Sequence, residues 1–135
     1  MRFAYTVLAG AIFLILFSCK KNLELGSRSS VSLKNCIQNK SDNIKVCLDS
    51  VIEDSRCPLD VVCVWQGTAV AKFSVTVNDQ ERPVTLATYS RPGFPPSDTI
   101  LLGYKIEFLD LLPYPEVGKS HDISEYRAEL RITKQ

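Results

Sequence analysis

The chain has 135 residues, with 16 lysine and arginine residues against 15 aspartate and glutamate residues and a single histidine. This near-neutral balance argues against binding to nucleic acid through a basic patch. A chain of this length fits one globular domain.

The N-terminal segment has the pattern of an export signal. Met1-Arg2 gives a short positive start, and residues 3–17 form an uncharged apolar run. As a helix, this run would reach about 22 Å, which is short of the roughly 30 Å hydrocarbon core of a bilayer. It ends in Leu16-Phe17-Ser18-Cys19, which resembles the lipobox of bacterial lipoproteins. The resemblance implies a signal peptide over residues 1–18 and a lipid anchor on Cys19.

The residues after Cys19 favour cleavage and indicate a location. The alternative is an ordinary signal peptide or signal anchor with an incidental cysteine, but the abrupt change to Lys20-Lys21 fits removal of the apolar run. These lysines stand where an aspartate is associated with inner-membrane retention in some Gram-negative bacteria. We therefore expect a lipid-anchored protein of the cell envelope, in the outer membrane rather than the inner one.

Residues 19–43 are predicted to be the lipidated cysteine and a flexible tether. Residues 20–43 are dominated by Ser, Asn, Lys and Gly, with isolated apolar residues and no sustained period. Such a segment buries too little apolar surface to offset the entropy of ordering. The single folded domain is then expected over residues 44–135.

Within that domain the apolar residues alternate with polar ones. The alternating apolar positions are Ile44, Val46 and Leu48; Ala69, Ala71, Phe73, Val75 and Val77; Val84 and Leu86; Tyr104, Ile106 and Phe108; and Tyr126, Ala128, Leu130 and Ile132. A period of two predicts antiparallel strands with one buried face. Tyr126 also resembles, loosely, the tyrosine corner of immunoglobulin-like sandwiches. We predict an all-β antiparallel sandwich, with immunoglobulin-like topology as the leading arrangement and a small β-barrel as the alternative.

The most distinctive segment is Asp54-Ser55-Arg56-Cys57-Pro58, followed by Cys63, Trp65 and Gly67. It resembles a motif of small uncharacterised bacterial envelope lipoproteins, which implies a small β-rich domain of unknown function. Extending the alternation of the next strand backwards places Cys63 and Trp65 on the buried face. We therefore expect both in the core, provided that Gly67 does not mark a bulge. Asp54 and Arg56 are expected to form an ion pair; the alternative is that Arg56 binds a carboxylate ligand.

Setting Cys19 aside leaves four cysteines, which allow three pairings. We favour Cys57–Cys63, which closes a short loop, together with Cys36–Cys47, because Cys47 falls on the exposed face of its strand. Metal binding or redox exchange is the alternative. The spacing from Cys57 to Cys63 is longer than that of a C-x-x-C motif and lacks a nearby histidine. Structural disulfides, with no metal and no cofactor, are therefore expected.

The sequence offers no combination of residues that predicts catalysis. His121 is the only histidine, and its neighbours Ser120 and Asp122 cannot form a triad with it, because triad groups converge from separate segments. Nucleophile elbows, zinc signatures and phosphate-binding glycine loops are all missing from the sequence. We therefore predict that the protein is not an enzyme and assign no catalytic residue.

Two proline-rich loops are the predicted binding surface. Phe94 lies in residues 89–96 and Tyr114 in residues 112–116, where prolines reduce the entropy lost on binding. The alternative is that both rings fold back over the ends of the sandwich. One hypothesis is a binding or accessory module that contacts an envelope protein or glycan through Phe94 and Tyr114. The other is an inhibitor of an envelope enzyme, with Leu59 or Asp60 of the Cys57–Cys63 loop entering the cleft.

Overall fold

The computed structural model describes residues 22–135, so the predicted signal peptide and Cys19 lie outside the described residues. The elements in chain order are β1 (Arg28–Ser32), β2 (Cys36–Asn39), β3 (Ile44–Asp54), β4 (Ala69–Val77), β5 (Gln80–Ala87), β6 (Asp98–Leu101), β7 (Tyr104–Leu112), the short 3-10 helix η1 (Ile123–Glu125) and β8 (Arg127–Lys134).

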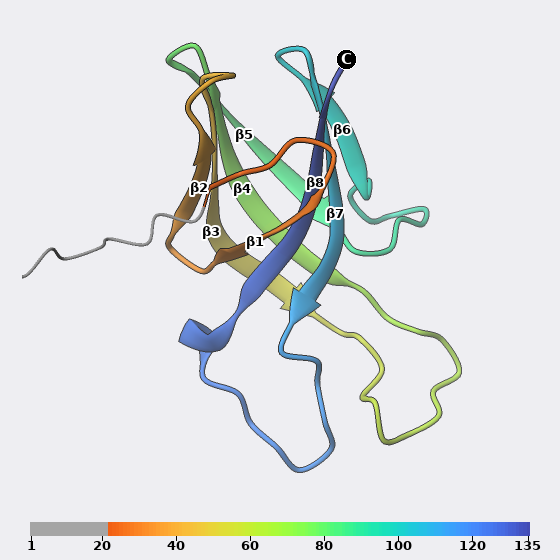
Figure 1. Ribbon diagram of the computed structural model, residues 1–135. Coiled ribbons are helices and arrows are strands. Elements are labelled where there is room, and N and C mark those ends of the chain that lie inside the picture. Colours follow the sequence, from red (N-terminus) through yellow and green to blue (C-terminus); the bar gives the residue numbers. More distant parts are fainter. Residues whose placement is uncertain (1–21) are drawn as a thin grey trace, which may run out of the picture.

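The strands form two four-stranded antiparallel sheets that face each other (Figure 1). One sheet has the order β1-β8-β7-β6 and the other β2-β3-β4-β5. The core lies between them, where the ring of Phe73 on β4 meets that of Phe108 on β7 edge-on, with centroids 5.2 Å apart. This geometry is a favoured one for aromatic pairs. The prediction of an all-β sandwich is confirmed, and the two sheets are not closed into the alternative barrel.

The predicted faces of the strands are also confirmed where alternation was cleanest. The inward residues of β3, β4 and β8 are buried, from Ile44 and Ala69 to Ile132. Val84 and Tyr126 are exceptions, because both are only partly buried. Alternation therefore identified the buried faces of these three strands correctly.

The prediction of an immunoglobulin-like topology is wrong. Hydrogen-bonded neighbours are consecutive in the chain, except that β1 pairs with β8, whereas an immunoglobulin sandwich has Greek-key connections. Tight turns explain the difference. Asn78-Asp79 and Leu102-Gly103 all have positive φ, as two-residue hairpin turns require, so β4 pairs with β5 and β6 pairs with β7.

The prediction of a flexible tether is wrong from Asn22 onward. β1 and β2 lie within it, and its isolated apolar residues Leu23, Val31 and Ile37 are buried. Short edge strands need only one or two inward side chains each, so no sustained period marks them in the sequence. The Cys36–Cys47 disulfide is confirmed and joins directly opposed residues of β2 and β3. The folded domain therefore begins near Asn22 rather than at residue 44.

Candidate functional site

The loop between β3 and β4 begins with a narrow neck. The Ser55 amide donates to the Thr68 carbonyl (2.9 Å), and the Cys57 amide donates to the Gln66 carbonyl (2.8 Å). Gly67 has φ of +71° and lies against Ser55, whose carbonyl oxygen would be only 1.9 Å from a Cβ at that position. Only glycine fits there without backbone movement, which gives the glycine of the distinctive motif a structural reason.

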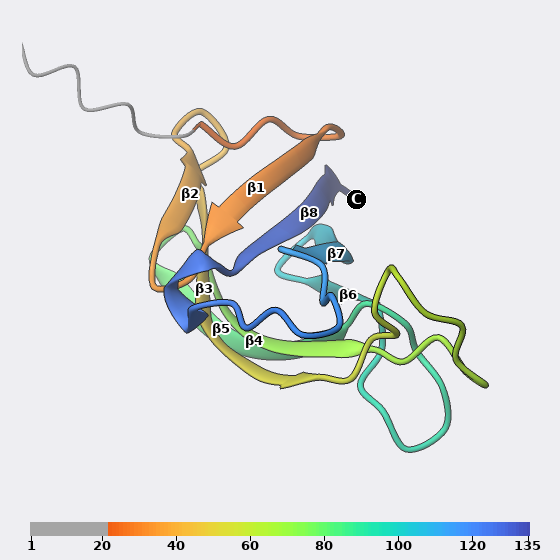
Figure 2. The ribbon, with the colours of Figure 1, turned by 90° about the horizontal axis from the view of Figure 1, so that it is seen from below.

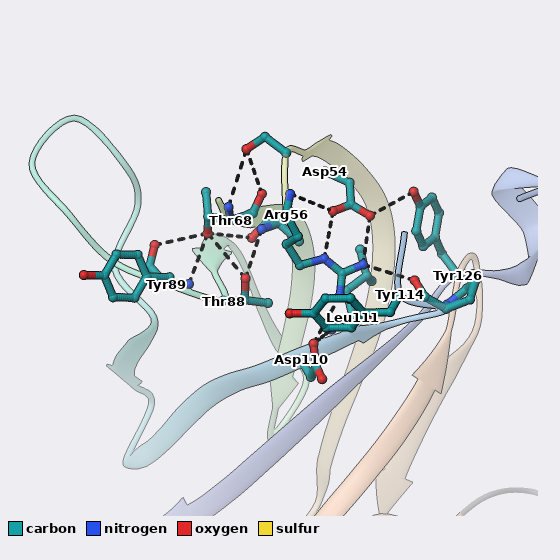
Figure 3. Close-up of polar contacts among 12 residues, drawn as sticks. Asp54, Arg56, Thr68, Thr88, Tyr89, Asp110, Leu111, Tyr114 and Tyr126 are labelled. Carbon is teal, nitrogen blue, oxygen red and sulfur yellow. Dashed lines mark hydrogen bonds and ion pairs between the residues drawn. The ribbon is translucent and has the colours of Figure 1, made fainter. Parts of the chain in front are cut away.

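Arg56 ties the end of β3 to the end of β7 in the opposite sheet (Figure 3). Its Nε donates to Asp54 Oδ1 (2.7 Å), and its Nη2 donates to Asp54 Oδ2 (2.8 Å) and to the Pro113 carbonyl (3.1 Å). Its Nη1 donates to Asp110 Oδ1 (3.2 Å) and to the Leu111 carbonyl. The expected ion pair with Asp54 is confirmed. Because all five N–H groups of this buried side chain have partners, Arg56 has no donor left for a carboxylate ligand.

Two tyrosines complete this cluster. The ring of Tyr114 lies over the Arg56 guanidinium, 4.2 Å from its central carbon to the ring centroid. The hydroxyl of Tyr126 donates to Asp54 Oδ2 (3.1 Å). Tyr126 therefore differs from a tyrosine corner, in which the hydroxyl bonds to backbone, and its role here is to anchor the Asp54 carboxylate.

The surroundings shift the pKa of each ionisable member. Burial alone would raise the pKa of Asp54, but the hydrogen bonds and charge of Arg56, with the Tyr126 hydroxyl, outweigh it and hold that pKa below its usual range. Burial would lower the pKa of Arg56, but Asp54 and Asp110 raise it. Burial and the Asp54 charge raise the pKa of Tyr126. All three shifts favour an ionised Asp54–Arg56 pair under a neutral tyrosine.

Trp65 and Phe94 meet outside the core, so the predicted burial of Cys63 and Trp65 is wrong. The Arg91 guanidinium lies 4.0 Å from the Trp65 ring centroid and 4.6 Å from that of Phe94. Trp65 keeps 37% of its surface exposed, and Cys63 is exposed as well. The alternation of β4 does not extend past Ala69, because the chain turns at Gly67 with positive φ.

The loop of residues 113–122 contacts the loop between β3 and β4 on another side. The Leu59 amide donates to the Pro115 carbonyl (3.1 Å), and the Val117 amide donates to Asp60 Oδ1 (3.0 Å). Residues 57–67, 89–96 and 113–122 thus meet at one end of the sandwich, and we call them the three-loop surface. Seen from that end, the first two loops lie side by side (Figure 2).

The disulfide loop, residues 57–63, and the residues just after it expose an unusual amount of apolar surface. Val62 and Val64 are fully exposed, at 102% and 104%, and Leu59 is 69% exposed. The Cys57–Cys63 disulfide is confirmed and closes this loop. Soluble monomers rarely expose large contiguous apolar patches, and such patches often mark interaction sites. Val62 and Val64 were missed as site residues, although the apolar run of residues 61–65 between Pro58 and Gly67 was a signal.

The predicted binding aromatics support this surface instead of forming its tip. Phe94 is partly buried beside Arg91 and Trp65, and Tyr114 is partly buried over Arg56. Thr68 fixes the start of the Phe94 loop, because its hydroxyl accepts the Tyr89 amide (3.1 Å) and contacts the Thr88 hydroxyl (3.4 Å). Both rings therefore hold loops in place, which leaves the aliphatic tip as the better candidate for contact.

Several other polar groups at this end are paired with one another. His121 has Nδ1 3.4 Å from the Glu125 carboxylate and Nε2 3.2 Å from the Tyr114 carbonyl, while Ser124 Oγ donates to Asp122 (2.6 Å). A hollow of about 190 Å³ beside Arg56 is lined partly by members of the Arg56 cluster, Asp110 and Tyr114, and partly by its neighbours, such as Gly67 and Thr88.

Residues 22–135 contain no group of three or more His, Cys, Asp or Glu residues placed to hold a metal ion. None of the helices in this described part is long and apolar enough to cross a bilayer. Comparisons of the chain with protein-family models, with curated proteins and with solved structures found no match.

Proposed function

We propose that the protein is a lipid-anchored binding module of the cell envelope, and that its docking element is the disulfide loop together with Val64 and Trp65. The anchor rests on the lipobox-like Leu16-Phe17-Ser18-Cys19 and on the lysines that follow it. The docking element rests on one observation. Val62 and Val64 are fully exposed on a loop that a disulfide, Arg56 and two neighbouring loops hold in place.

Bracing makes such a loop effective in binding. A loop that is already ordered loses little conformational entropy on association, so more of the contact energy appears as affinity. The disulfide closes residues 57–63, the Pro115 carbonyl accepts from Leu59, and Asp60 accepts from Val117. The aliphatic tip is then presented in one conformation, with Trp65, which is 37% exposed, next to Val64 in the chain.

The chemistry of the tip favours a protein partner over a glycan. The side chains of Leu59, Val62 and Val64 offer no hydrogen-bond donor or acceptor. Burying them against sugar hydroxyls would leave those hydroxyls without partners, which costs free energy. An apolar recess on a protein surface fits them better, with Trp65 at the edge of the contact.

Inhibition of an envelope enzyme is the second candidate, and the disposition of Leu59 favours it. Leu59 is 69% exposed while its backbone amide is held by the Pro115 carbonyl, so the side chain could enter a cleft without loss of loop geometry. Asp60 is less suited to insertion, because its carboxylate is engaged with the Val117 amide. In this case the partner would be an enzyme whose activity rises when Cys57→Ser/Cys63→Ser replaces the native chain.

Photocrosslinking in cells tests the proposal. A photoreactive residue replaces Val62 in the full chain, with the same residue at Ile100, 66% exposed on β6, as the matched control. A protein adduct from position 62 that is missing from position 100 is expected, and Cys19→Ala should diminish it. Identical adducts at both positions, or none at 62, would overturn the docking assignment. The role of the anchor would be overturned if the Cys19→Ala variant gave an unchanged adduct, or if the native chain carried no lipid.

A further inference from the structure

The N-terminal end of the described chain is fixed at the end of the sandwich opposite the three-loop surface. The Leu23 amide donates to the Gln38 carbonyl (2.9 Å), and Leu23 is buried. Gln38 is opposite Lys45 near the start of β3. Figure 1 shows this end with the turns after β2 and β4, and the loop between β3 and β4 at the other end. Chain entry and the docking element are therefore separated by the length of the strands.

The length of the strands and the length of the segment from Cys19 to Asn22 decide how far the lipid can lie from the loop. Lys45 is opposite Thr76 on β4, and the neck of the loop begins at Ala69, seven residues along that strand. At about 3.3 Å per residue this is roughly 23 Å, and the exposed tip lies beyond it. From Asn22 back to Cys19 there are three residues, which span at most about 11 Å. A lipid on Cys19 therefore stays close to the entry end of the sandwich.

The composition of the loop also disfavours contact with a lipid surface. Amphipathic helices that lie in a membrane interface combine an apolar face with lysine or arginine, which attract anionic lipid headgroups. In residues 57–67 the only charged residue is Asp60, an anion, and the neighbouring Arg91 is engaged with the rings of Trp65 and Phe94. Laying the sandwich on its side would instead put polar outward-facing side chains such as Lys72 and Ser74 on the membrane. Neither the orientation with the loop facing the membrane nor the one with the sandwich on its side favours contact of the exposed valines with the bilayer.

We infer that the three-loop surface is held away from the membrane that carries Cys19, and that Val62 and Val64 dock into an apolar recess of a second envelope protein. This inference rests on the proposed lipid anchor and docking element. It adds that the partner approaches from the side of the sandwich remote from the lipid. A partner surface buried within the same bilayer is thereby excluded.

The single tryptophan makes this orientation measurable, because Trp65 lies in the three-loop surface. The lipidated full chain is reconstituted into phosphatidylethanolamine–phosphatidylglycerol vesicles whose acyl chains carry bromine, a short-range quencher of indole fluorescence. Trp65 should emit as strongly in these vesicles as in unbrominated ones. In the matched control, Lys40→Trp in a Trp65→Phe background puts the indole at the entry end, and we expect bromine to quench it.

Each outcome bears on a separate claim. Quenching of Trp65 to the same extent as the Lys40→Trp indole would overturn the inference, because the loop would then lie in the bilayer. A full chain that fails to float with vesicles would overturn the lipid anchor, and the inference with it. Protein adducts at position 62 would still support docking if the orientation alone were wrong, whereas lipid adducts there would refute the protein recess.

Discussion

Asp54 and Arg56, only two residues apart, form a two-point ion pair in which Nε is 2.7 Å from Oδ1 and Nη2 is 2.8 Å from Oδ2. The pair lies where the last residues of β3 leave the sheet. From there, Arg56 also reaches Asp110, Leu111 and Pro113 at the end of β7 in the opposite sheet. A planar guanidinium matches a carboxylate and several carbonyls at fixed angles. The pair thus sets the position from which the disulfide loop begins.

Replacing Arg56 should be strongly destabilising. Arg56→Met leaves the Asp54 carboxylate, whose side chain is only 10% exposed, without its cation. Breaking a buried pair from one side costs about 3–5 kcal/mol. Urea unfolding monitored by circular dichroism measures the loss. Arg82→Met, on the exposed part of β5, is the control and should change the free energy of unfolding by less than about 0.5 kcal/mol. Equal effects of the two substitutions would contradict the role of the cluster.

The same pair predicts how stability depends on pH. The pKa of Asp54 is lower in the folded protein than in the unfolded chain, so the folded state holds fewer protons in this range. Its contribution is fully present above the unfolded pKa of about 3.9 and is lost as the pH falls through the folded pKa. Native protein should therefore lose more unfolding free energy between about pH 5 and pH 2 than Asp54→Asn does. Parallel pH profiles for the two chains would show that Asp54 has no such role.

Gly67 and Gly93 form a matched pair of glycines in the three-loop surface. Both have positive φ, but a Cβ on Gly67 would lie 1.9 Å from the Ser55 carbonyl, whereas one on Gly93 would meet nothing within 4 Å. Gly93→Ala should cost only the conformational penalty, about 1–2 kcal/mol. Gly67→Ala should cost clearly more, because the neck of the loop must open. Thermal unfolding of both variants decides the point, and a Gly67→Ala variant as stable as Gly93→Ala would refute the close contact.

Removal of either disulfide should lower the stability of the protein by a similar amount, but the two removals should differ in their effect on binding. Closed segments with sequence separations of 11 and 6 residues predict a loss of about 2–3 kcal/mol for each pair changed to serine. Only Cys57→Ser/Cys63→Ser loosens the docking element, so only this variant should lose capture of the partner. Calorimetry gives the stability, and crosslinking in cells gives the capture. Loss of capture with Cys36→Ser/Cys47→Ser as well would indicate that general stability limits binding.

The sequence predicted the strands and their buried faces better than it predicted which strands pair with each other. The alternation through Ile44, Phe73 and Leu130 identified the buried faces, because one buried side chain in two is a local property of an antiparallel strand. Which strands pair depends on turns such as Asn78-Asp79, whose positive φ values close a hairpin. The immunoglobulin-like prediction failed because it ignored that local pairing. β1 and β2 were missed because each contributes few inward side chains.

The candidate site was predicted in its parts and missed in its arrangement. The two disulfides and the Asp54–Arg56 pair followed from spacing and charge, both of which act over short stretches of chain. The meeting of Arg91 with Trp65, and of Pro115 with Leu59, brings together loops distant in sequence. No period or motif encodes such contacts. Val62 was overlooked because valine is among the residue types that are most often buried.

The most direct test of the docking assignment replaces Val62 and Val64 together by aspartate and compares the double variant with Ile100→Asp. All three side chains are well exposed, so each chain should keep an unfolding free energy within about 0.5 kcal/mol per substitution of the native value. The measurement is crosslinking in cells followed by affinity capture of the full chain. The account predicts that Val62→Asp/Val64→Asp loses the captured partner while Ile100→Asp retains it. Full capture by the folded double variant would contradict the proposal that the disulfide loop is the docking element.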